Sequence, residues 1–552
     1  MKPSKSERVE LSMDTLEAIL EQARSKPLSE EQYNQLKGVL NTLGRLTQEL
    51  EKKRTSIFRL RNLLFGPQTE KTADVLKKKK QKANDASQGS GRGQGKKEKR
   101  KGHGRNGAET YTGAKRVKVA HASLKPGDAC PESGCTGKVY RLADPGLIVR
   151  IQGLPPLPAT VYELEKLRCN LCGTVFTAQA PDGIGETKYD ETAVSMIACL
   201  KYGAGFPFNR LEKLEANLGI PLPAATQWDL VKDASEVLEP VFDAILDEAA
   251  QGEVLHNDDT PMKILELMAE NQRLEESSEE PSKRTGLFTS GVIAKRGEHL
   301  MALFFTGRNH AGENLQALLE RRSKALPLPI HMCDALSRNL PKAFETLLAN
   351  CLGHGRRRFV DVVESFPEEV RYILETLAKV YKNDALARQD NLSPEDRLSF
   401  HQKDSGPLMQ ELHKWFKRQF EEKNVEPNSS LGEAITYMLN HWQALTLFLR
   451  EPGAPLDNNI CERALKKAIL HRKNSLFYKT QNGARVGDIY MTLIHTAELA
   501  GANTFDYLCE LQRHAGELKA NPGQWMPWNF RETLRRIATE GNRQAPERSP
   551  PD

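Results

Sequence analysis

Two short apolar runs, each ending in a carboxylate, place the tightest limit on how this chain can fold. Residues 254–261 read Val-Leu-His-Asn-Asp-Asp-Thr-Pro, and residues 329–334 read Pro-Ile-His-Met-Cys-Asp. Short apolar runs bounded by turn residues are typical of buried strands, so the aspartates are expected where two strands end. An aspartate there can simply cap a turn, because a desolvated acid needs hydrogen bonds or a cation.

Glu462 is a third acidic residue that changes this interpretation. Residues 455–463 read Pro-Leu-Asp-Asn-Asn-Ile-Cys-Glu-Arg, which places Glu462 in the first turns of a predicted helix. Taken alone, it could form an ordinary exposed pair with Lys466, one turn further along. Two aspartates from strand ends and a glutamate from a helix are, however, the oxygen-rich set that two hard divalent cations need.

These stretches resemble, in order and surroundings, those of DDE transposases of the insertion sequence 66 family, from about residue 35 to about residue 530. Residues 65–71 (Phe-Gly-Pro-Gln-Thr-Glu-Lys) resemble the sequence that ends the family's zipper region, and residues 457–463 match its DNN(x)2ER motif. The resemblance implies a multidomain α+β chain. Its ribonuclease H-like α/β catalytic core would contain an all-helical insertion and would follow a coiled-coil helix, a zinc ribbon and a helical, helix-turn-helix-like domain.

The resemblance also implies an activity: Mg-dependent polynucleotidyl transfer that cleaves and joins DNA at the ends of an insertion sequence. Asp258, Asp334 and Glu462 would be catalytic and would hold two Mg²⁺ ions about 4 Å apart. The family's usual Asp-Glu pair is Asp258-Asp259 here, so the motif leaves open which aspartate is the metal ligand. The two residues after Asp334 also differ from the family's usual Gly-Tyr.

A chain of 552 residues is too long for one hydrophobic core, and several domains are expected. The patterns and the family resemblance together imply these segments: an N-terminal coiled-coil region (1–72), a disordered basic linker (73–115), a zinc ribbon (116–185), a helix-turn-helix-like DNA-binding domain (186–250), the first part of the core (251–365), a helical insertion (366–450), the second part of the core with the catalytic glutamate (451–515) and a C-terminal tail (516–552).

Within the first part of the core, the same patterns predict three further elements. Residues 286–308 read as a β-hairpin, and a helix is expected from residue 311 to about residue 326. Residues 270–284 are acidic and rich in serine, which predicts a solvated loop.

Residues 35–65 carry a heptad pattern of apolar side chains that includes Leu36, Leu43 and Leu50, with Lys53 as a polar break. Four such heptads predict a coiled coil through which the chain forms a homodimer or a higher oligomer. An amphipathic helix packed on its own domain is the alternative.

Residues 77–106 contain twelve Lys and Arg and two acidic residues, a net charge of +10 in a chain whose formal net charge is +6. The rest of the chain is therefore acidic. This segment has too few apolar side chains to order itself, and it can neutralise the phosphates of double-stranded DNA without reading sequence. A solvated spacer without a partner is the alternative.

Four of the nine cysteines come as two close pairs, Cys130 with Cys135 and Cys169 with Cys172. They bracket residues 147–151 and 160–164, whose composition is that of strands. Four thiolates in this arrangement predict a zinc ribbon with one structural Zn²⁺, whereas two redox pairs would need a βαβ context that is lacking. The other cysteines are scattered, which indicates a reducing compartment rather than a disulfide framework.

Two further motifs and a set of basic side chains complete the predicted site. Residues 208–219 and 224–234 read as two helices with a short turn, which fits a helix-turn-helix and equally a packed bundle. Cys351 and His354 form a CxxH motif that resembles one near the active site of several DDE families, and we expect them to support the core. The alternative is a buried Cys and a hydrogen-bonded His before a basic surface strand at 356–358. DNA phosphates are expected to meet Arg356, Arg358, Arg463, Lys466, Arg472 and Lys473.

No stretch approaches eighteen consecutive apolar residues, and the N-terminus lacks an apolar signal core. We therefore expect no membrane span and a cytoplasmic, nucleoid-associated bacterial protein. The resemblance implies accessory proteins of the same element as further partners. Two other classes stay open: a DNA-binding or bridging protein derived from a transposase that has lost catalysis, and a nuclease that cuts without joining.

Overall fold

The structure is a computed structural model that describes residues 13–40, 116–133, 135–142, 154–168, 175–182, 187–276 and 285–544, with single residues at 50, 53, 72 and 109. Contacts divide the chain into two compact units. One is Lys82–Pro158, and the other consists of Met1–Gln81 and Ala159–Asp552.

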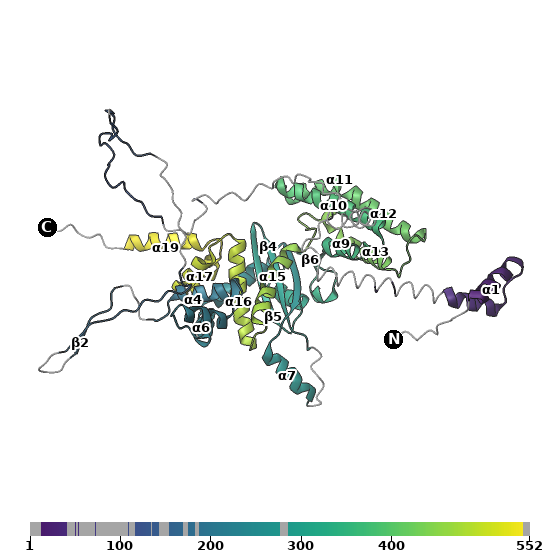
Figure 1. Cartoon of the computed structure of the whole chain (residues 1–552), viewed down its shortest axis with the longest axis horizontal. Helices are drawn as coiled ribbons and strands as arrows, with labels where there is room; N and C mark the ends of the chain where they lie inside the picture. Colours follow the sequence, from purple (N-terminus) through teal and green to yellow (C-terminus); the bar gives the residue numbers. More distant parts are fainter. Residues whose placement is uncertain are drawn as a thin grey trace, which may run out of the picture. The chain divides into compact units, whose positions relative to one another are not determined.

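A five-stranded mixed sheet is the scaffold of the larger unit (Figure 1), and its strand order is β5-β4-β3-β6-β7. The strands are β3 (Val254–Pro261), β4 (Phe288–Arg296), β5 (His299–Gly307), β6 (Ile330–Cys333) and β7 (Leu347–Asn350). β3, β4 and β5 form an antiparallel meander, while β6 and β7 run parallel to β3. The strands predicted before Asp258 and before Asp334, and the predicted hairpin, are confirmed. Because β3 and β6 are parallel neighbours, their carboxyl ends lie at the same edge of the sheet.

Helix α16 (Gln481–Leu499) covers the outer edge of β5, which would otherwise present unpaired backbone groups. Its side chains accept hydrogen bonds from alternate N–H groups of the strand: Ala302 to Thr496 and Phe304 to Thr492, both at 3.1 Å, and Thr306 to Asp488 at 2.7 Å. Helical residues four apart rise about 6 Å and alternate strand residues about 6.8 Å, so the two repeats nearly match.

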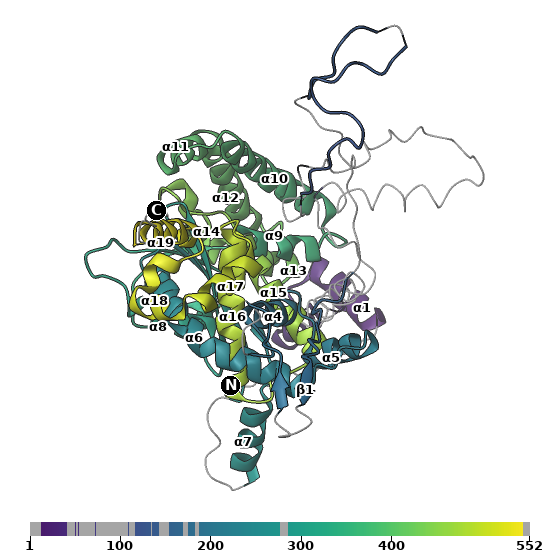
Figure 2. The ribbon, with the colours of Figure 1, turned by 90° about the vertical axis from the view of Figure 1, so that its left-hand side faces the viewer.

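A helical segment follows β7 and includes residues 366–450, for which a helical insertion is predicted. Its helices are α9 (Leu352–Asp361), α10 (Pro367–Gln389), α11 (Pro394–Asp404), α12 (Gly406–Glu421), α13 (Ser430–Asn440) and α14 (Trp442–Leu445). The views in Figures 1 and 2 both show α10, α11 and α12 side by side. Phe359 and Phe416 stack within their shared core at a centroid distance of 5.8 Å. The Ser393 side chain caps α11 by accepting a hydrogen bond from the Asp396 N–H.

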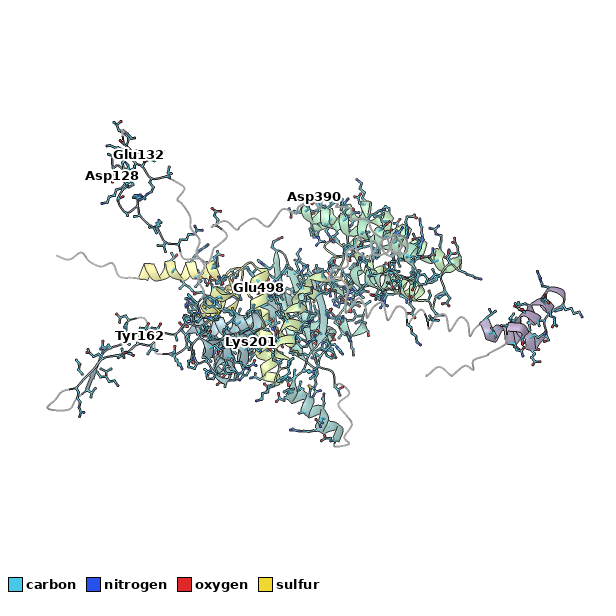
Figure 3. The ribbon with its side chains drawn as sticks, viewed as in Figure 1. Asp128, Glu132, Tyr162, Lys201, Asp390 and Glu498 are labelled. Atoms are coloured by element: carbon cyan, nitrogen blue, oxygen red, sulfur yellow. The ribbon has the colours of Figure 1, made fainter. Side chains whose placement is uncertain are left out.

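Helices also precede the sheet: α4 (Glu191–Ala198), the π-helix η2 (Cys199–Gly203), α5 (Phe208–Asn217) and α6 (Ala224–Ala250). The two helices predicted for a helix-turn-helix are both present. The second is much longer than expected and runs on to Ala250, with Pro240 inside it. Lys201 of η2, labelled in Figure 3, is buried here and donates to the Ser475 hydroxyl at 2.8 Å.

Four predicted segments differ from the structure. Residues 270–276, predicted as loop, belong to helix α7 (Leu265–Glu276), and residues 277–284 lie outside the described residues. Helix α8 (Ala311–Leu319) ends before residue 326. Residues 160–164 are exposed and are not a strand. The predicted tail is helical at first, in α18 (Ala515–Ala520) and α19 (Phe530–Gln544), because Trp525 and Phe530 are buried and anchor it.

At the N-terminus, helix α1 (Met13–Ser25) is followed by a helical stretch at residues 30–40. Most of the predicted coiled coil and most of the predicted basic linker lie outside the described residues. Among the helices that the structure describes, none combines the length and the apolar composition needed to cross a membrane.

Candidate active site

Asp258 near the end of β3 and Asp334 just after β6 lie at the same edge of the sheet, as the parallel pairing of the two strands requires. Burial, together with the negative charge of Asp334, raises the pKa of Asp258 to about 7. The charges of Asp259 and Glu462 contribute to this rise, and a hydrogen bond from the Asp259 N–H opposes it. Burial also raises the pKa of Asp334, against the opposing effects of His354, Arg338 and Asn339. Asp334 and Glu462 both lie close enough to Asp258 for their charges to disfavour its ionised form.

Glu462 reaches this edge from the first turn of helix α15 (Asn459–Ser475). Its Oε1 lies 3.8 Å from Nε2 of His354 in α9. The preceding residue, Cys461, donates from Sγ to the carbonyl of Gly291, which is the β4 partner of Asp258. A Cβ at Gly291 would lie 3.1 Å from the side chain of Leu465, so the glycine lets α15 approach the sheet closely.

A buried network around Asn458 fixes the start of α15. The Asn458 side chain is fully buried, and its Oδ1 lies 3.0 Å from Nδ1 of His256. Its Nδ2 donates to the Asn257 carbonyl at 3.0 Å, and its backbone N–H donates to Sγ of Cys351 at 3.3 Å. The asparagine of one motif and the cysteine of another are thereby joined to β3, four residues before Glu462 in the chain.

A second buried chain of hydrogen bonds supports Asp334. Nε2 of His331 lies 2.9 Å from Oδ1 of Asn257, whose Nδ2 donates to the Asn339 carbonyl at 2.8 Å. Asn339 in turn donates from its side chain to Asp334. Sequence reasoning did not assign roles to His256, Asn257, His331 or Asn339. The signal was present in the first three, which are polar residues at buried positions of apolar strands.

Asp258 and Asp259 have different surroundings, as expected for successive residues of a strand. The Asp259 side chain is 1% exposed, and its Oδ2 lies 2.8 Å from Nδ1 of His310. Its Oδ1 lies 3.5 Å from the guanidinium of Arg338. Asp259 therefore has a close partner in His310 and a more distant one in Arg338, whereas Asp258 lies beside the other acids. Of the two aspartates, Asp258 is the one that could hold a metal together with those acids.

The chemistry of this donor set fits Mg²⁺, because three carboxylates supply hard oxygen ligands and their mutual repulsion leaves negative charge to be neutralised. A different trio, Cys351, His354 and Glu462, has ligand atoms within 4.8 Å of one another. Burial raises the pKa of the Cys351 thiol to about 11, and its Sγ already accepts a hydrogen bond from the Asn458 N–H at 3.3 Å. Cys351 and His354 lie in the supporting layer beside the acids.

The predicted DNA-binding side chains are not equivalent in the structure. Arg463, Lys466 and Lys473 are exposed on α15. Arg472 donates to the Thr260 hydroxyl at 3.0 Å and to the Pro261 carbonyl, so it ties α15 to the end of β3.

The other two predicted arginines lie on α9, because residues 356–358 are helical and not the surface strand considered from sequence. Buried Phe359 and Val360 pack this helix onto the insertion. The Arg358 guanidinium lies 3.9 Å from the centre of the Tyr437 ring, and Arg356 lies 3.4 Å from the Thr72 hydroxyl.

The smaller unit contains the first cysteine pair of the predicted zinc ribbon. The Cys130 N–H donates to the Gly137 carbonyl at 2.8 Å, and Asp128 and Glu132 of the same turn are labelled in Figure 3. Hydrogen bonds from the Gly137 backbone and the Cys130 side chain lower the pKa of Cys135, which favours the thiolate.

Cys169 and Cys172 lie outside the described residues, between strands β1 (Lys166–Arg168) and β2 (Val175–Thr177) of the larger unit. Those two strands pair antiparallel. The zinc ribbon stays a prediction.

Comparison with known proteins bears on the same region. The model of the family described as "Transposase IS66 family" matches residues 186–486, which include all three acids. The chain is 27% identical over 423 residues to the uncharacterized protein y4jD of Sinorhizobium fredii (strain NBRC 101917 / NGR234), covering 72% of this chain and 77% of that protein. It is also 27% identical over 387 residues to the uncharacterized protein y4hP of the same organism, covering 66% and 67%. Because the family match spans more than half of the sequence, this chain belongs to the transposase IS66 family.

Proposed function

We propose that the chain is a DDE transposase that cleaves the ends of its own DNA element and joins them to a target. The observation that carries this proposal is the convergence of Asp258, Asp334 and Glu462 from two parallel strands and a helix, in a chain of the transposase family. The order of the sheet supports a ribonuclease H-like core, since an antiparallel meander is followed by two parallel strands.

Asp258, Asp334 and Glu462 would hold two Mg²⁺ ions. When bound, such ions help to ionise the attacking water or 3′-hydroxyl and stabilise the leaving oxygen of an in-line displacement. The chain's own part is to present carboxylates that bind cations without donating protons to the reaction. Asn458 and Arg472 hold α15 on β3, so Glu462 keeps its place when DNA binds.

The partner we propose is double-stranded DNA, both the element ends and the target. Arg463, Lys466 and Lys473 are exposed on the helix that carries Glu462, and cations there would neutralise phosphates close to the acids. We further propose one structural Zn²⁺ held by Cys130, Cys135, Cys169 and Cys172, and an oligomer formed through residues 35–65.

The direct test is cleavage and strand transfer in vitro with a labelled duplex that carries the inverted repeat bordering the gene. The wild-type chain is expected to nick and join this DNA only when Mg²⁺ is present. Asp258→Asn and Glu462→Gln should each lower both rates by at least about 10³-fold, because each removes a metal-binding charge. Both variants should keep nearly wild-type affinity for the duplex.

Glu320→Gln provides the matched control, since this exposed glutamate lies at the end of α8 and outside the site. It should cleave and join like the wild type. Cleavage retained by Asp258→Asn would refute the assignment of the site. Cleavage without any joining would identify a nuclease, and DNA binding without either reaction would identify a bridging protein.

A further inference from the structure

A second cluster of charged side chains lies beside the three acids and consists of Asp259, His310 and Arg338. A carboxylate as buried as Asp259 is costly unless it is paired. His310 already provides a partner at 2.8 Å, and its ring also packs against Phe288 at a centroid distance of 4.2 Å. Asp259 is therefore largely satisfied without Arg338.

Arg338 is only loosely engaged by this pairing. Its guanidinium is 3.5 Å from Asp259, and its side chain remains 46% exposed. Among the residues that the structure describes, Asp259 is the one acid within ion-pair distance of it. A guanidinium carries five N–H donors in a planar fork, so this single long contact leaves most of them available for another anion.

The backbone that carries Arg338 is, in contrast, held firmly. Arg338 lies in the short 3-10 helix η3 (Ser337–Asn339), which begins three residues after Asp334 in the chain. Asn339 is tied to Asp334 through its side chain and to Asn257 through its carbonyl. On the other side, a Cβ at Gly312 of α8 would lie 2.7 Å from the Arg338 carbonyl. Helix α8 therefore packs so closely against η3 that only glycine fits at this position.

Arg338 thus combines a fixed backbone, an exposed cationic head and a position next to the proposed metal ligands. Its positive charge acts on Asp334 as well as on Asp259, which places it near both. The substrate of the proposed reaction is a phosphodiester, whose two non-bridging oxygens match the spacing of the guanidinium fork. Charge on those oxygens must be stabilised during an in-line displacement at phosphorus.

We infer that Arg338 binds a non-bridging oxygen of the scissile phosphate, with Asp259 and His310 as positioning residues that aim its guanidinium into the site. This inference rests on the proposed function, because it identifies a further contact to the same substrate. Arg338 donates hydrogen bonds and exchanges no proton. The alternative is that Arg338 only neutralises the charge of Asp259. In that case, replacing Arg338 would lower the stability of the chain but would not change its discrimination between modified and unmodified phosphates.

The test measures affinity without turnover, in Ca²⁺ in place of Mg²⁺. The probe is the same end duplex with a single methylphosphonate of defined stereochemistry at the scissile position, which replaces one or the other non-bridging oxygen by a methyl group. For one of the two isomers, the wild-type chain should bind about tenfold more weakly than it binds unmodified DNA. Arg338→Gln should bind unmodified DNA more weakly and should lose the discrimination against that isomer, to about twofold or less.

Arg371→Gln is the matched control, because Arg371 in α10 is also 46% exposed and also pairs with a single acid, Glu368. It should discriminate like the wild type. Arg338→Lys keeps the positive charge but not the planar guanidinium, so its ratio of affinities for unmodified and modified DNA should lie between those of the wild type and Arg338→Gln. This variant provides the test if Arg338→Gln does not fold.

Equal discrimination by the wild type, Arg338→Gln and Arg338→Lys would overturn the inference, as would a wild type that ignores both isomers. The same duplex is also assayed for cleavage in Mg²⁺. If the chain discriminates through Arg338 but does not cleave the duplex, the phosphate site is supported and the transposase proposal is refuted. If the chain cleaves but does not discriminate through Arg338, the transposase proposal is supported and the phosphate site is refuted.

Discussion

The position of Glu462 depends on a single buried amide. Asn458 contacts His256 and the Asn257 carbonyl through its side chain, while the next residue, Asn459, is exposed and pairs only locally with Asp457. The two asparagines of one motif therefore have different tasks. Asn458 joins α15 to the sheet, and Asn459 with Asp457 shapes the turn before the helix.

This difference predicts unequal costs of substitution. Asn458→Ala should lower the free energy of unfolding by about 2–4 kcal/mol, because it leaves the buried His256 ring and the Asn257 carbonyl without partners. Asn459→Ala, its control, should cost less than about 1 kcal/mol, since its amide is exposed to water. Urea unfolding of both variants measures this, and equal costs would contradict the proposed role of Asn458.

Three acids of the candidate site could be named from the sequence, whereas the contacts that hold them could not. Asp258, Asp334 and Glu462 could be named because their types and spacing resemble a motif. The choice between Asp258 and Asp259 could not be made, since it depends on His310 and Arg338, which lie far along the chain. The apolar strands around His256 and Asn257 indicate that both are buried, but their hydrogen-bond partners Asn458, His331 and Asn339 could not be predicted because they lie far along the chain.

Among the contacts between secondary-structure elements, the packing of α16 against β5 includes a buried acid, Asp488. Asp488 accepts from the Thr306 N–H and hydroxyl, each at 2.7 Å, yet burial raises its pKa to about 7 despite these hydrogen bonds. Between about pH 4 and pH 7, the folded chain therefore holds a proton that the unfolded chain has released. The contribution of Asp488 to the free energy of unfolding is fully present below about pH 4 and is lost as the pH rises through about 7.

Asp488→Asn should therefore flatten the dependence of stability on pH. Between pH 5 and pH 8, ionisation of Asp488 should lower the free energy of unfolding of the wild type by about 2–4 kcal/mol. The variant should not show this decrease, because an amide cannot ionise. Melting temperatures at both pH values, with the exposed Asp243→Asn as control, measure the difference. Parallel curves for the wild type and Asp488→Asn would contradict the shifted pKa.

The contact between α8 and η3 makes a prediction of its own. Gly312→Ala would drive a Cβ into the backbone around Arg338, which neither a rotamer nor a flexible side chain can relieve. We expect a destabilisation of about 2–3 kcal/mol. Gly516→Ala in α18, where a Cβ meets open space, should be neutral or slightly stabilising. Thermal unfolding compares the two helical glycines, and a harmless Gly312→Ala would argue against the close packing of η3.

Element types were easier to predict than element limits. The strands of the core could be predicted because apolar runs and a hairpin turn mark them in the sequence. Residues 356–358 are helical, because Phe359 and Val360 bury one face of α9, and three successive arginines hide that periodicity. The second of the two helices predicted before the core was expected to end at residue 234, whereas α6 continues to Ala250 with Pro240 inside it.

At the scale of the whole molecule, the predicted oligomer depends on residues 35–65, most of which lie outside the described residues. A chain without residues 1–72 should change from a dimer or higher oligomer to a monomer, since it lacks the heptads. Light scattering measures the mass, and removal of residues 545–552 serves as the control. If the truncated chain keeps the oligomeric state of the full chain, the oligomer forms through another surface.

The central claim is that Asp258, Asp334 and Glu462 share metal ions, and the most direct measurement is a crystal structure with Mn²⁺ in place of Mg²⁺. Anomalous scattering should show metal enclosed by these three carboxylates at ligand distances of about 2.1 Å, with Asp259 still paired to His310. Metal bound through Asp259, or a Glu462 carboxylate turned away from both aspartates with no metal between them, would contradict the account.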